Sequence, residues 1–268
     1  MADKSFGEAF QRLCDVMDKL RENCPWDKVQ TLETLKPYLL EETHEVLHAM
    51  DTGDSAAHQE ELGDLVFQVV FHARVRSEEP GGFTVADVCN GIADKLIRRH
   101  PHVFGPEAGH GATKASVRQS WEALKAQERA GKSALHGVPP SLPALARAQK
   151  VGEKAARVGF DWENADHVLQ KVEEELGELK DALRHGNREH VRAEMGDLLF
   201  SVAQLARFVE HNAEDALRET IGRFSRRFQY VERRLRESGK TPESAGMEEL
   251  ERLWGLAKQA EKQGQLDS

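Results

Sequence analysis

The sequence repeats itself at a constant interval of 133 residues. The word EELGDLVF at 60–67 returns as AEMGDLLF at 193–200. The same shift, without a gap, aligns three further pairs: Gly53 with Gly186, Arg74 with Arg207, and Trp121 with Trp254. This period is much longer than the repeat of a solenoid protein. The chain is therefore expected to fold as two copies of one domain.

A segment rich in Gly, Ser and Pro separates the two copies. It reads AGKSALHGVPPSLP over residues 130–143, a composition that favours turns and loops over helices. We expect an N-terminal domain at 1–129, a linker at 130–143 and a C-terminal domain at 144–268. Each copy then has the usual length of an independent domain.

Within each copy, the apolar residues recur at helical spacing. The segments TLKPYLLEETHEVLHAM (34–50) and AAHQEELGDLVFQVVFHARV (56–75) both place apolar residues three or four positions apart. Between them, DTGD (51–54) offers a glycine to end one helix and an Asp to cap the next, as RHGN does with Asn in the second copy. These two helices are therefore expected to form an antiparallel hairpin in each copy. A third helix is expected near 84–99 in the first copy and near 213–236 in the second. The predicted fold class is all-α, with two tandem helical-bundle domains.

Composition narrows the functional classes. The net charge of −9 leaves no surplus of cations for a phosphate backbone, so no nucleic-acid partner is expected. The three cysteines, Cys14, Cys24 and Cys89, fit a reducing compartment better than a disulfide framework. No segment approaches the roughly 18 apolar residues of a membrane span, and the N-terminus lacks an apolar signal core. A cytoplasmic protein without a membrane partner is expected.

Each copy carries two acidic motifs, E-E-x-x-E and then E-x-x-D. Residues three apart share one face of a helix, so each motif presents paired carboxylates beside the apolar stripe. Carboxylates that converge at a buried margin repel one another unless a cation neutralises them, and oxygen ligands select hard ions such as Mg²⁺ or Mn²⁺. The predicted metal ligands are Glu42, Glu45, Glu61 and Asp64 in the first copy, and Glu175, Glu178, Glu194 and Asp197 in the second.

Two other interpretations of these motifs stay open. Acidic runs on helices are often solvated faces, although a matched pair of motifs in both copies argues against this. A di-iron bundle needs Glu-x-x-His pairs on two helices. Glu41 and His44 have that spacing in the first copy, whereas Gly177 stands at the matching place in the second.

A basic cluster lies on the expected third helix of each copy. KLIRRHPHVF (95–104) contains Arg98 and Arg99, and GRFSRRFQYV (222–231) contains Arg226 and Arg227. Such arginines could clamp phosphate oxygens or could form ion pairs with the acidic helices. Trp121 and Trp254, each with a Lys four residues on, could stack a nucleobase or could belong to the core. A metal site, a phosphate clamp and a stacking platform together describe a pocket for a nucleoside triphosphate.

These motifs together resemble the MazG family of nucleoside triphosphate pyrophosphohydrolases. The resemblance covers nearly the whole chain, through CPWDKVQTLETLKPYLLEETHEVL, EELGDLVFQVVFHA, KLIRRHPHVFG, SALHGVPPSLPALARAQKVGEKAARVGFDW, KVEEELGEL and AEMGDLLFSVAQLAR. It implies two tandem all-α domains and Mg²⁺-dependent hydrolysis of NTPs or dNTPs, standard or non-standard, to the monophosphate and pyrophosphate. It also implies a homodimer and catalysis in the C-terminal domain.

Carried over by position, the resemblance assigns roles in the second copy. Glu175, Glu178, Glu194 and Asp197 would hold the metal, and the nucleotide would contact Lys171, Arg223, Arg226, Arg227 and Trp254. Glu174 lies beside these ligands in the sequence, and it could orient the attacking water or could support the ligands without contacting the metal. The chain departs from the family pattern where Ile221 and Arg223 replace a common Asn and Lys, and where His190 and Ala193 replace Lys and Glu. These departures leave the metal ligands intact and bear on base preference and rate. Tyr38 stands in the first copy at the place of Lys171, which favours the second copy as the catalyst.

Two functions of other classes compete with this one. A scaffold would bind nucleotide without turnover, and a phosphohydrolase of a different kind would release orthophosphate. Both full sets of carboxylates favour an enzyme over a scaffold.

Overall fold

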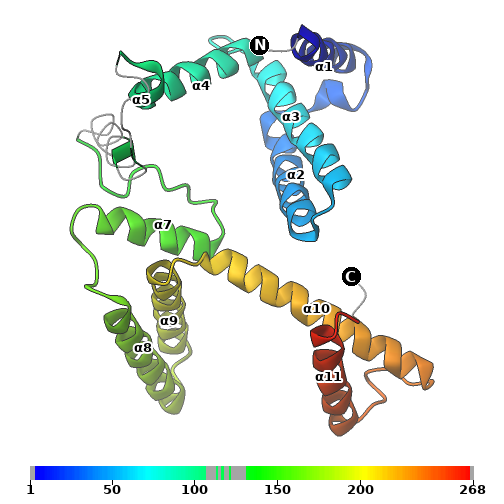
Figure 1. Ribbon diagram of the computed structural model, residues 1–268, viewed down its shortest axis with the longest axis vertical. Coiled ribbons are helices and arrows are strands. Elements are labelled where there is room, and N and C mark those ends of the chain that lie inside the picture. Colours follow the sequence, from blue (N-terminus) through cyan, green and yellow to red (C-terminus); the bar gives the residue numbers. More distant parts are fainter. Residues whose placement is uncertain (1–3, 107–112, 114–115, 118–120, 122–130, 266–268) are drawn as a thin grey trace. The chain divides into compact units, whose positions relative to one another are not determined.

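The structure is a computed structural model that describes residues 4–106, 113, 116–117, 121 and 131–265. Over these residues the regular structure is entirely helical, which confirms the predicted all-α class (Figure 1). The chain divides into two compact units, Met1–Glu128 and Arg129–Ser268, and each is described by itself. In the described part, no helix combines the length and apolarity needed to span a bilayer.

The N-terminal unit is built around an antiparallel helical hairpin, α2 (Leu32–Thr52) and α3 (Ser55–Ser77). Among its other elements, the structure describes α1 (Lys4–Asn23), the short 3-10 helix η1 (Asp27–Val29), α4 (Val85–Arg99) and α5 (Pro101–Phe104). Helix α1 packs on α3, and apolar residues of α1, α2 and α3 form a core of Met17, Leu35, Val70, Phe71 and Val75.

The hairpin turn follows from local chemistry. Gly53 ends α2 with φ of 70°, a left-handed conformation in which a side chain would be strained. The Asp54 side chain then accepts hydrogen bonds from the backbone N–H groups of Ala56 and Ala57 and so caps α3. The second unit repeats the device with Gly186, also at φ 70°, and Asn187. Both turns lie where the sequence predicts them.

The C-terminal unit has the corresponding hairpin, α8 (Ala165–His185) and α9 (Arg188–Phe208). Helix α7 (Ala144–Ala156) packs against α9, and α10 (Ala213–Glu237) contacts both of them near its start. The far end of α10 pairs with α11 (Met247–Lys262) around a second core of Val231, Leu235 and Leu253 (Figure 1).

The 133-residue interval extends to the helices before each hairpin. Arg21 near the end of α1 aligns with Lys154 near the end of α7. Arg21 Nη1 donates to the Gln30 carbonyl at 2.9 Å, and the buried Lys154 Nζ donates to the His136 carbonyl. In both units, a basic side chain therefore fastens a neighbouring loop to the helix that covers the hairpin.

Close contact between α7 and α9 depends on the absence of a side chain at Gly152. A Cβ at this position would lie 1.8 Å from Gln204 Oε1. Gln204 is fully buried, donates to the Ala148 carbonyl at 2.8 Å and accepts a hydrogen bond from Arg207 Nε at 3.1 Å. A polar group in a core must be satisfied in this way. Glycine thus lets a hydrogen-bonded glutamine hold two helices together.

Candidate metal and nucleotide site

Three carboxylates of the C-terminal unit converge between α8 and α9. Glu175, Glu194 and Asp197 each offer an oxygen atom, and these atoms all lie within 4.8 Å of one another. Glu175 is only 5% exposed, so bulk water cannot solvate its charge, and the ionised side chain needs a partner of opposite charge. A set of carboxylate oxygens at this spacing matches the ligands of a hard divalent cation.

The fourth predicted ligand, Glu178, stands beside this trio of Glu175, Glu194 and Asp197. Its carboxylate is not among the mutually close atoms, but loss of hydration and the charges of Glu175 and Glu194 raise its pKa. A raised pKa means that the ionised form is disfavoured while no cation is present. Glu178 therefore feels the charges of this cluster without being one of its three mutually close carboxylates.

Lys171 provides a cation from within the chain. Its Nζ lies 2.8 Å from a carboxylate oxygen of Glu174 and 2.8 Å from one of Glu175. These hydrogen bonds raise the pKa of Lys171 above its ordinary value. On the opposite helix, His190 Nε2 lies 3.1 Å from Glu194 Oε1. Two residues named from the sequence, Lys171 and Glu174, thus meet at the edge of the trio.

The predicted nucleotide contacts on α10 and α11 lie together on the other helix pair. Arg227 donates from Nε and Nη2 to Glu261 Oε2, and its guanidinium lies 5.9 Å from the centre of the Trp254 ring. Phe224 packs on the same indole, with 5.0 Å between ring centroids. Trp254 also packs against the α10–α11 core, as one of its two sequence interpretations expects, and the stacking of a nucleobase stays a prediction.

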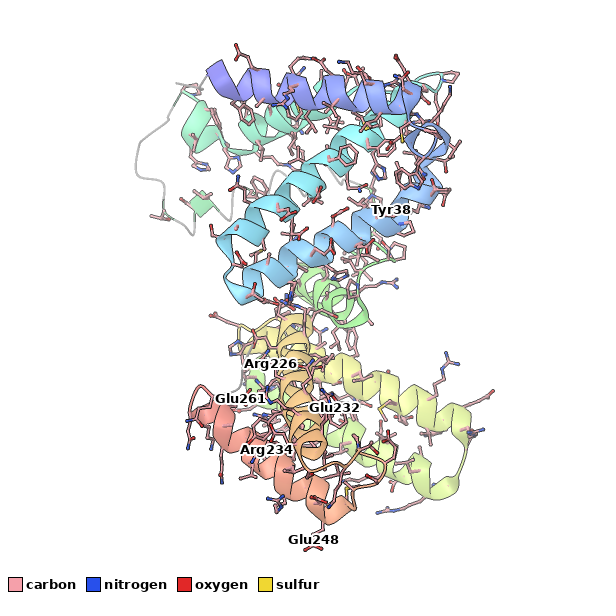
Figure 2. The ribbon with its side chains drawn as sticks, turned by 90° about the vertical axis from the view of Figure 1, so that its right-hand side faces the viewer. Tyr38, Arg226, Glu232, Arg234, Glu248 and Glu261 are labelled. Atoms are coloured by element: carbon pink, nitrogen blue, oxygen red, sulfur yellow. The ribbon has the colours of Figure 1, made fainter. Side chains whose placement is uncertain are left out.

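Arg223 and Arg226 take different environments on α10. Arg223 Nη2 donates to Thr220 Oγ1 at 2.9 Å. Arg226, which is labelled in Figure 2, is exposed. Within the described part of one chain, no hydrogen bond or ion pair joins these arginines or Arg227 to the acidic trio. The expected phosphate clamp and the expected metal ligands therefore occupy two separate helix pairs.

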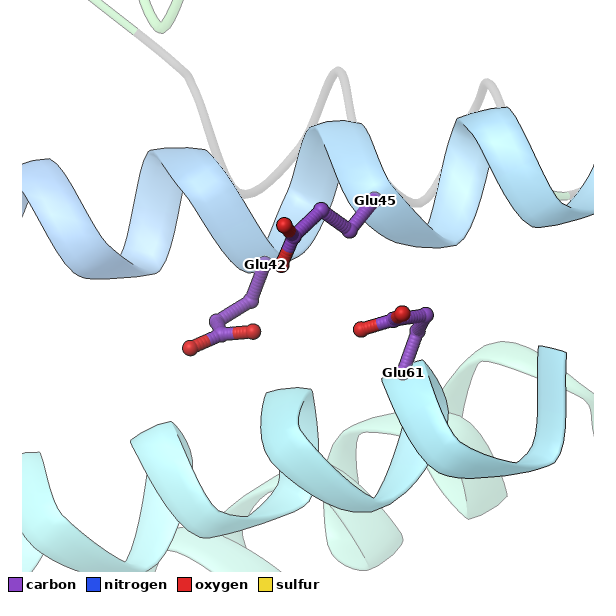
Figure 3. A group of neighbouring side chains, drawn as sticks. All are labelled: Glu42, Glu45 and Glu61. Carbon is purple, nitrogen blue, oxygen red and sulfur yellow. The ribbon is translucent and has the colours of Figure 1, made fainter. Parts of the chain in front are cut away.

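The N-terminal unit has a matching cluster between α2 and α3. Glu42, Glu45 and Glu61 point toward one another, with oxygen atoms within 4.8 Å (Figure 3). Asp64 lies outside this trio, although its charge, after burial, is the next largest reason that the pKa of Glu42 is raised. Tyr38, at the place of Lys171, lies in a T-shaped contact with Trp26 and packs on the core, and it supplies no cation.

The basic cluster of the N-terminal unit is arranged around an aromatic ring. The Arg99 guanidinium lies 5.3 Å from the centre of the Trp121 ring, and His100 packs on the same ring at 4.8 Å. Arg98, the other predicted clamp residue, lies one position before Arg99 in α4.

Comparison with known proteins gives these clusters a context. The model of the MazG nucleotide pyrophosphohydrolase domain matches the chain twice, at residues 30–104 and 163–232. Each match contains one hairpin and one complete set of predicted carboxylates. The chain belongs to the MazG family.

Two relatives of similar length and a longer one support this membership. A protein of Thermotoga maritima, the nucleoside triphosphate pyrophosphohydrolase/pyrophosphatase MazG, is 43% identical over 95% of this chain and 98% of its own length. The nucleoside triphosphate pyrophosphohydrolase of Escherichia coli is 44% identical over 93% of this chain and 97% of its own length. A pyrophosphohydrolase of Mycobacterium tuberculosis is 42% identical over 59% of this chain and 48% of its own. The predicted tandem arrangement of two MazG domains is therefore confirmed.

Three residues of these MazG domains were not found from the sequence. Gln68, Gln204 and Glu261 are polar residues in helical segments, and nothing in their spacing separates them from a solvated helix face. The structure buries Gln68 and Gln204 and pairs Glu261 with Arg227. The alignment of the two copies could have indicated the burial of Gln204, because this residue aligns with the core residue Phe71 of the first copy.

Proposed function

We propose that this MazG protein hydrolyses nucleoside triphosphates to nucleoside monophosphates and pyrophosphate in its C-terminal domain, with Mg²⁺ as the cofactor. The observation that carries the proposal is the convergence of Glu175, Glu194 and Asp197 beside the ammonium of Lys171. The buried Glu175 carboxylate and its close neighbours fit a divalent cation, and Mn²⁺ offers a similar oxygen preference.

The residues around the trio divide the work of the reaction. A bound divalent cation would supply charge stabilisation for the polyphosphate. Lys171 lies at the edge of the cluster and would donate to a phosphate oxygen once its carboxylate partners are engaged. Glu174, next to the buried Glu175, would orient a water molecule for attack on phosphorus and accept its proton. The bond between that phosphorus and the bridging oxygen then breaks, and pyrophosphate leaves.

Arginines complete the proposed site by stabilising the charge of the leaving group. Arg223, Arg226 and Arg227 all lie on α10, whereas the trio lies on α8 and α9. We propose that a homodimer brings the two helix pairs of neighbouring chains together. The heptad-spaced Leu169, Leu176 and Leu183 of α8 support this, because they are exposed in a single chain and suit burial against another helix.

The test of this proposal is a product analysis. The full chain is incubated with a panel of NTPs and dNTPs, standard and non-standard, in Mg²⁺ or Mn²⁺, and the products are identified by phosphorus NMR. We expect the monophosphate and pyrophosphate in equal amounts. Release of orthophosphate would replace the proposed reaction with another phosphohydrolase activity. Thermal stabilisation by nucleotide with no product would indicate a binding scaffold.

A further inference from the structure

Gln68 lies buried at the acidic cluster of the N-terminal unit with half of its amide unsatisfied. Its side chain is on α3, one turn after Asp64, and the residue is only 4% exposed. The amide Nε2 donates to Glu42 Oε1 at 3.4 Å, whereas Oε1 is buried and has no hydrogen-bond partner. A buried, unpaired amide oxygen is rare in folded proteins because it loses its hydration without compensation. This oxygen therefore indicates an interaction that forms only with a ligand.

The carboxylates beside Gln68 also lack a partner of opposite charge. In the described residues, no Lys or Arg forms an ion pair with Glu42, Glu45 or Glu61. Each of the three carboxylates offers an oxygen atom, and these atoms lie within 4.8 Å of one another, so their charges repel. The contrast with the C-terminal unit is direct, because there Lys171 supplies a cation 2.8 Å from Glu175. The N-terminal cluster is the one that needs a cation from solution.

A half-turn of the Gln68 amide would convert the present arrangement into a ligand set. With the cluster as described, the N–H group faces the Glu42 carboxylate, since an amide oxygen there would be repelled. Once a cation lies between the carboxylates, the oxygen becomes the favourable end to face it. Which end of an amide points where is set by such surroundings.

We propose that Glu42, Glu45, Glu61 and the amide oxygen of Gln68 form a divalent-cation site that fills without nucleotide. The inference rests on the proposed metal dependence of these MazG clusters and adds a ligand and a division of roles to it. At the corresponding positions, the C-terminal unit has Ser201 in place of Gln68 and Lys171 in place of Tyr38. Its internal cation competes with the metal, so that site requires the charge of a nucleotide to fill. The N-terminal unit holds its metal alone and serves as a structural or regulatory site.

The experiment measures Mn²⁺ binding to the full chain without nucleotide, by the loss of the free-ion signal in electron paramagnetic resonance. The chain carries Asp197→Ala to disable the C-terminal cluster. We expect one Mn²⁺ per chain to remain bound. Adding Gln68→Leu should lower the affinity by about 10-fold or more, as expected when a group that supports a metal site is removed. Gln68→Glu retains an oxygen ligand and should restore the affinity.

Two controls separate a lost ligand from a lost fold. Ser201→Ala changes the corresponding position of the other unit and should leave nucleotide-free Mn²⁺ binding unaltered. Circular dichroism and thermal melts in chelator should show that Gln68→Leu is folded without metal. Glu45→Gln should abolish binding and so locate the ion at this cluster.

Three results would overturn the inference: no Mn²⁺ bound without nucleotide, equal affinity in wild type and Gln68→Leu, or equal loss in Gln68→Leu and Gln68→Glu. None of these bears on pyrophosphate release by the wild-type chain, which is assayed separately with nucleotide. A chain that releases pyrophosphate but binds no Mn²⁺ alone would reject the inference and keep the proposed function. A chain that binds Mn²⁺ without nucleotide but releases no pyrophosphate would reject the proposed function and keep the inference.

Discussion

Gly152→Ala tests the contact that holds α7 against the hairpin of the C-terminal unit. The new Cβ would lie 1.8 Å from Gln204 Oε1, far inside van der Waals contact. Gln204 is fully buried, and both ends of its amide are hydrogen-bonded, so the amide cannot move away without giving up these bonds. Relief requires either that Gln204 leaves its hydrogen bonds or that α7 moves away from α9.

The cost can be estimated from the groups involved. Loss of the hydrogen bonds from Gln204 to Ala148 and from Arg207 to Gln204 costs about 1 kcal/mol each. Crowding of a packed core adds roughly 1–3 kcal/mol, and the better helix propensity of alanine returns about 1 kcal/mol. We expect a net loss of roughly 2–4 kcal/mol. For a unit of this size, the melting temperature should fall by on the order of 10 °C.

Differential scanning calorimetry of the full chain provides the assay, with Gly255→Ala as the matched control. Gly255 lies in α11 of the same unit, and a Cβ there meets nothing within 4 Å. The control should melt at or slightly above the wild-type temperature, since only the propensity gain applies. If Gly152→Ala also melts at or above wild type, the close approach of α7 to α9 and the role of Gln204 are refuted.

Three further substitutions have distinct expected outcomes. Lys171→Met should tighten Mn²⁺ binding to the C-terminal cluster without nucleotide, because the ammonium no longer competes with the metal for the carboxylates. It should also lower kcat/KM for pyrophosphate release about 10- to 100-fold, the equivalent of one charge-assisted hydrogen bond. Weaker Mn²⁺ binding would refute the competition between Lys171 and the metal. Glu261→Gln should raise KM for the nucleotide roughly 5-fold and change kcat little, because Arg227 loses its fixed orientation; an unchanged KM would show that this pair has no part in binding. Glu42→Gln should raise the melting temperature of the N-terminal unit at pH 7 in chelator. The pKa of Glu42 is raised in the folded unit, so the unit loses stability as the pH rises through that pKa and Glu42 ionises, whereas Gln stays neutral. The gain should vanish in melts near pH 4, and a gain equal at both values would contradict the stated cause.

The sequence was sufficient for the parts that depend on periodicity and turn chemistry. Gly53 with Asp54, and Gly186 with Asn187, fixed both hairpin turns because each residue type suits one backbone requirement. Spacing of three residues on a helix predicted that Glu175 would meet the carboxylates of α9. These features are local, or repeat a local rule, and so can be inferred without coordinates.

The remaining features depend on side-chain directions across helices. Nothing in the sequence distinguishes Asp64, outside the N-terminal trio, from Asp197, inside the C-terminal one, although the two align. Likewise, Gln68 and Gln204 look like surface residues until the packing of α2 and α7 against the next helix is known. Burial of a polar side chain is a property of the tertiary contact and leaves little trace in helical periodicity.

The most direct test of the central claim compares Asp197→Ala with its counterpart Asp64→Ala in the full chain. Pyrophosphate release is measured with saturating nucleotide and Mg²⁺, and circular dichroism verifies that both variants are folded. If the carboxylates of α8 and α9 hold the catalytic cation, Asp197→Ala should lose at least about 100-fold in kcat, and Asp64→Ala should lose far less. Equal activity in Asp197→Ala and wild type, or the large loss in Asp64→Ala alone, would contradict it.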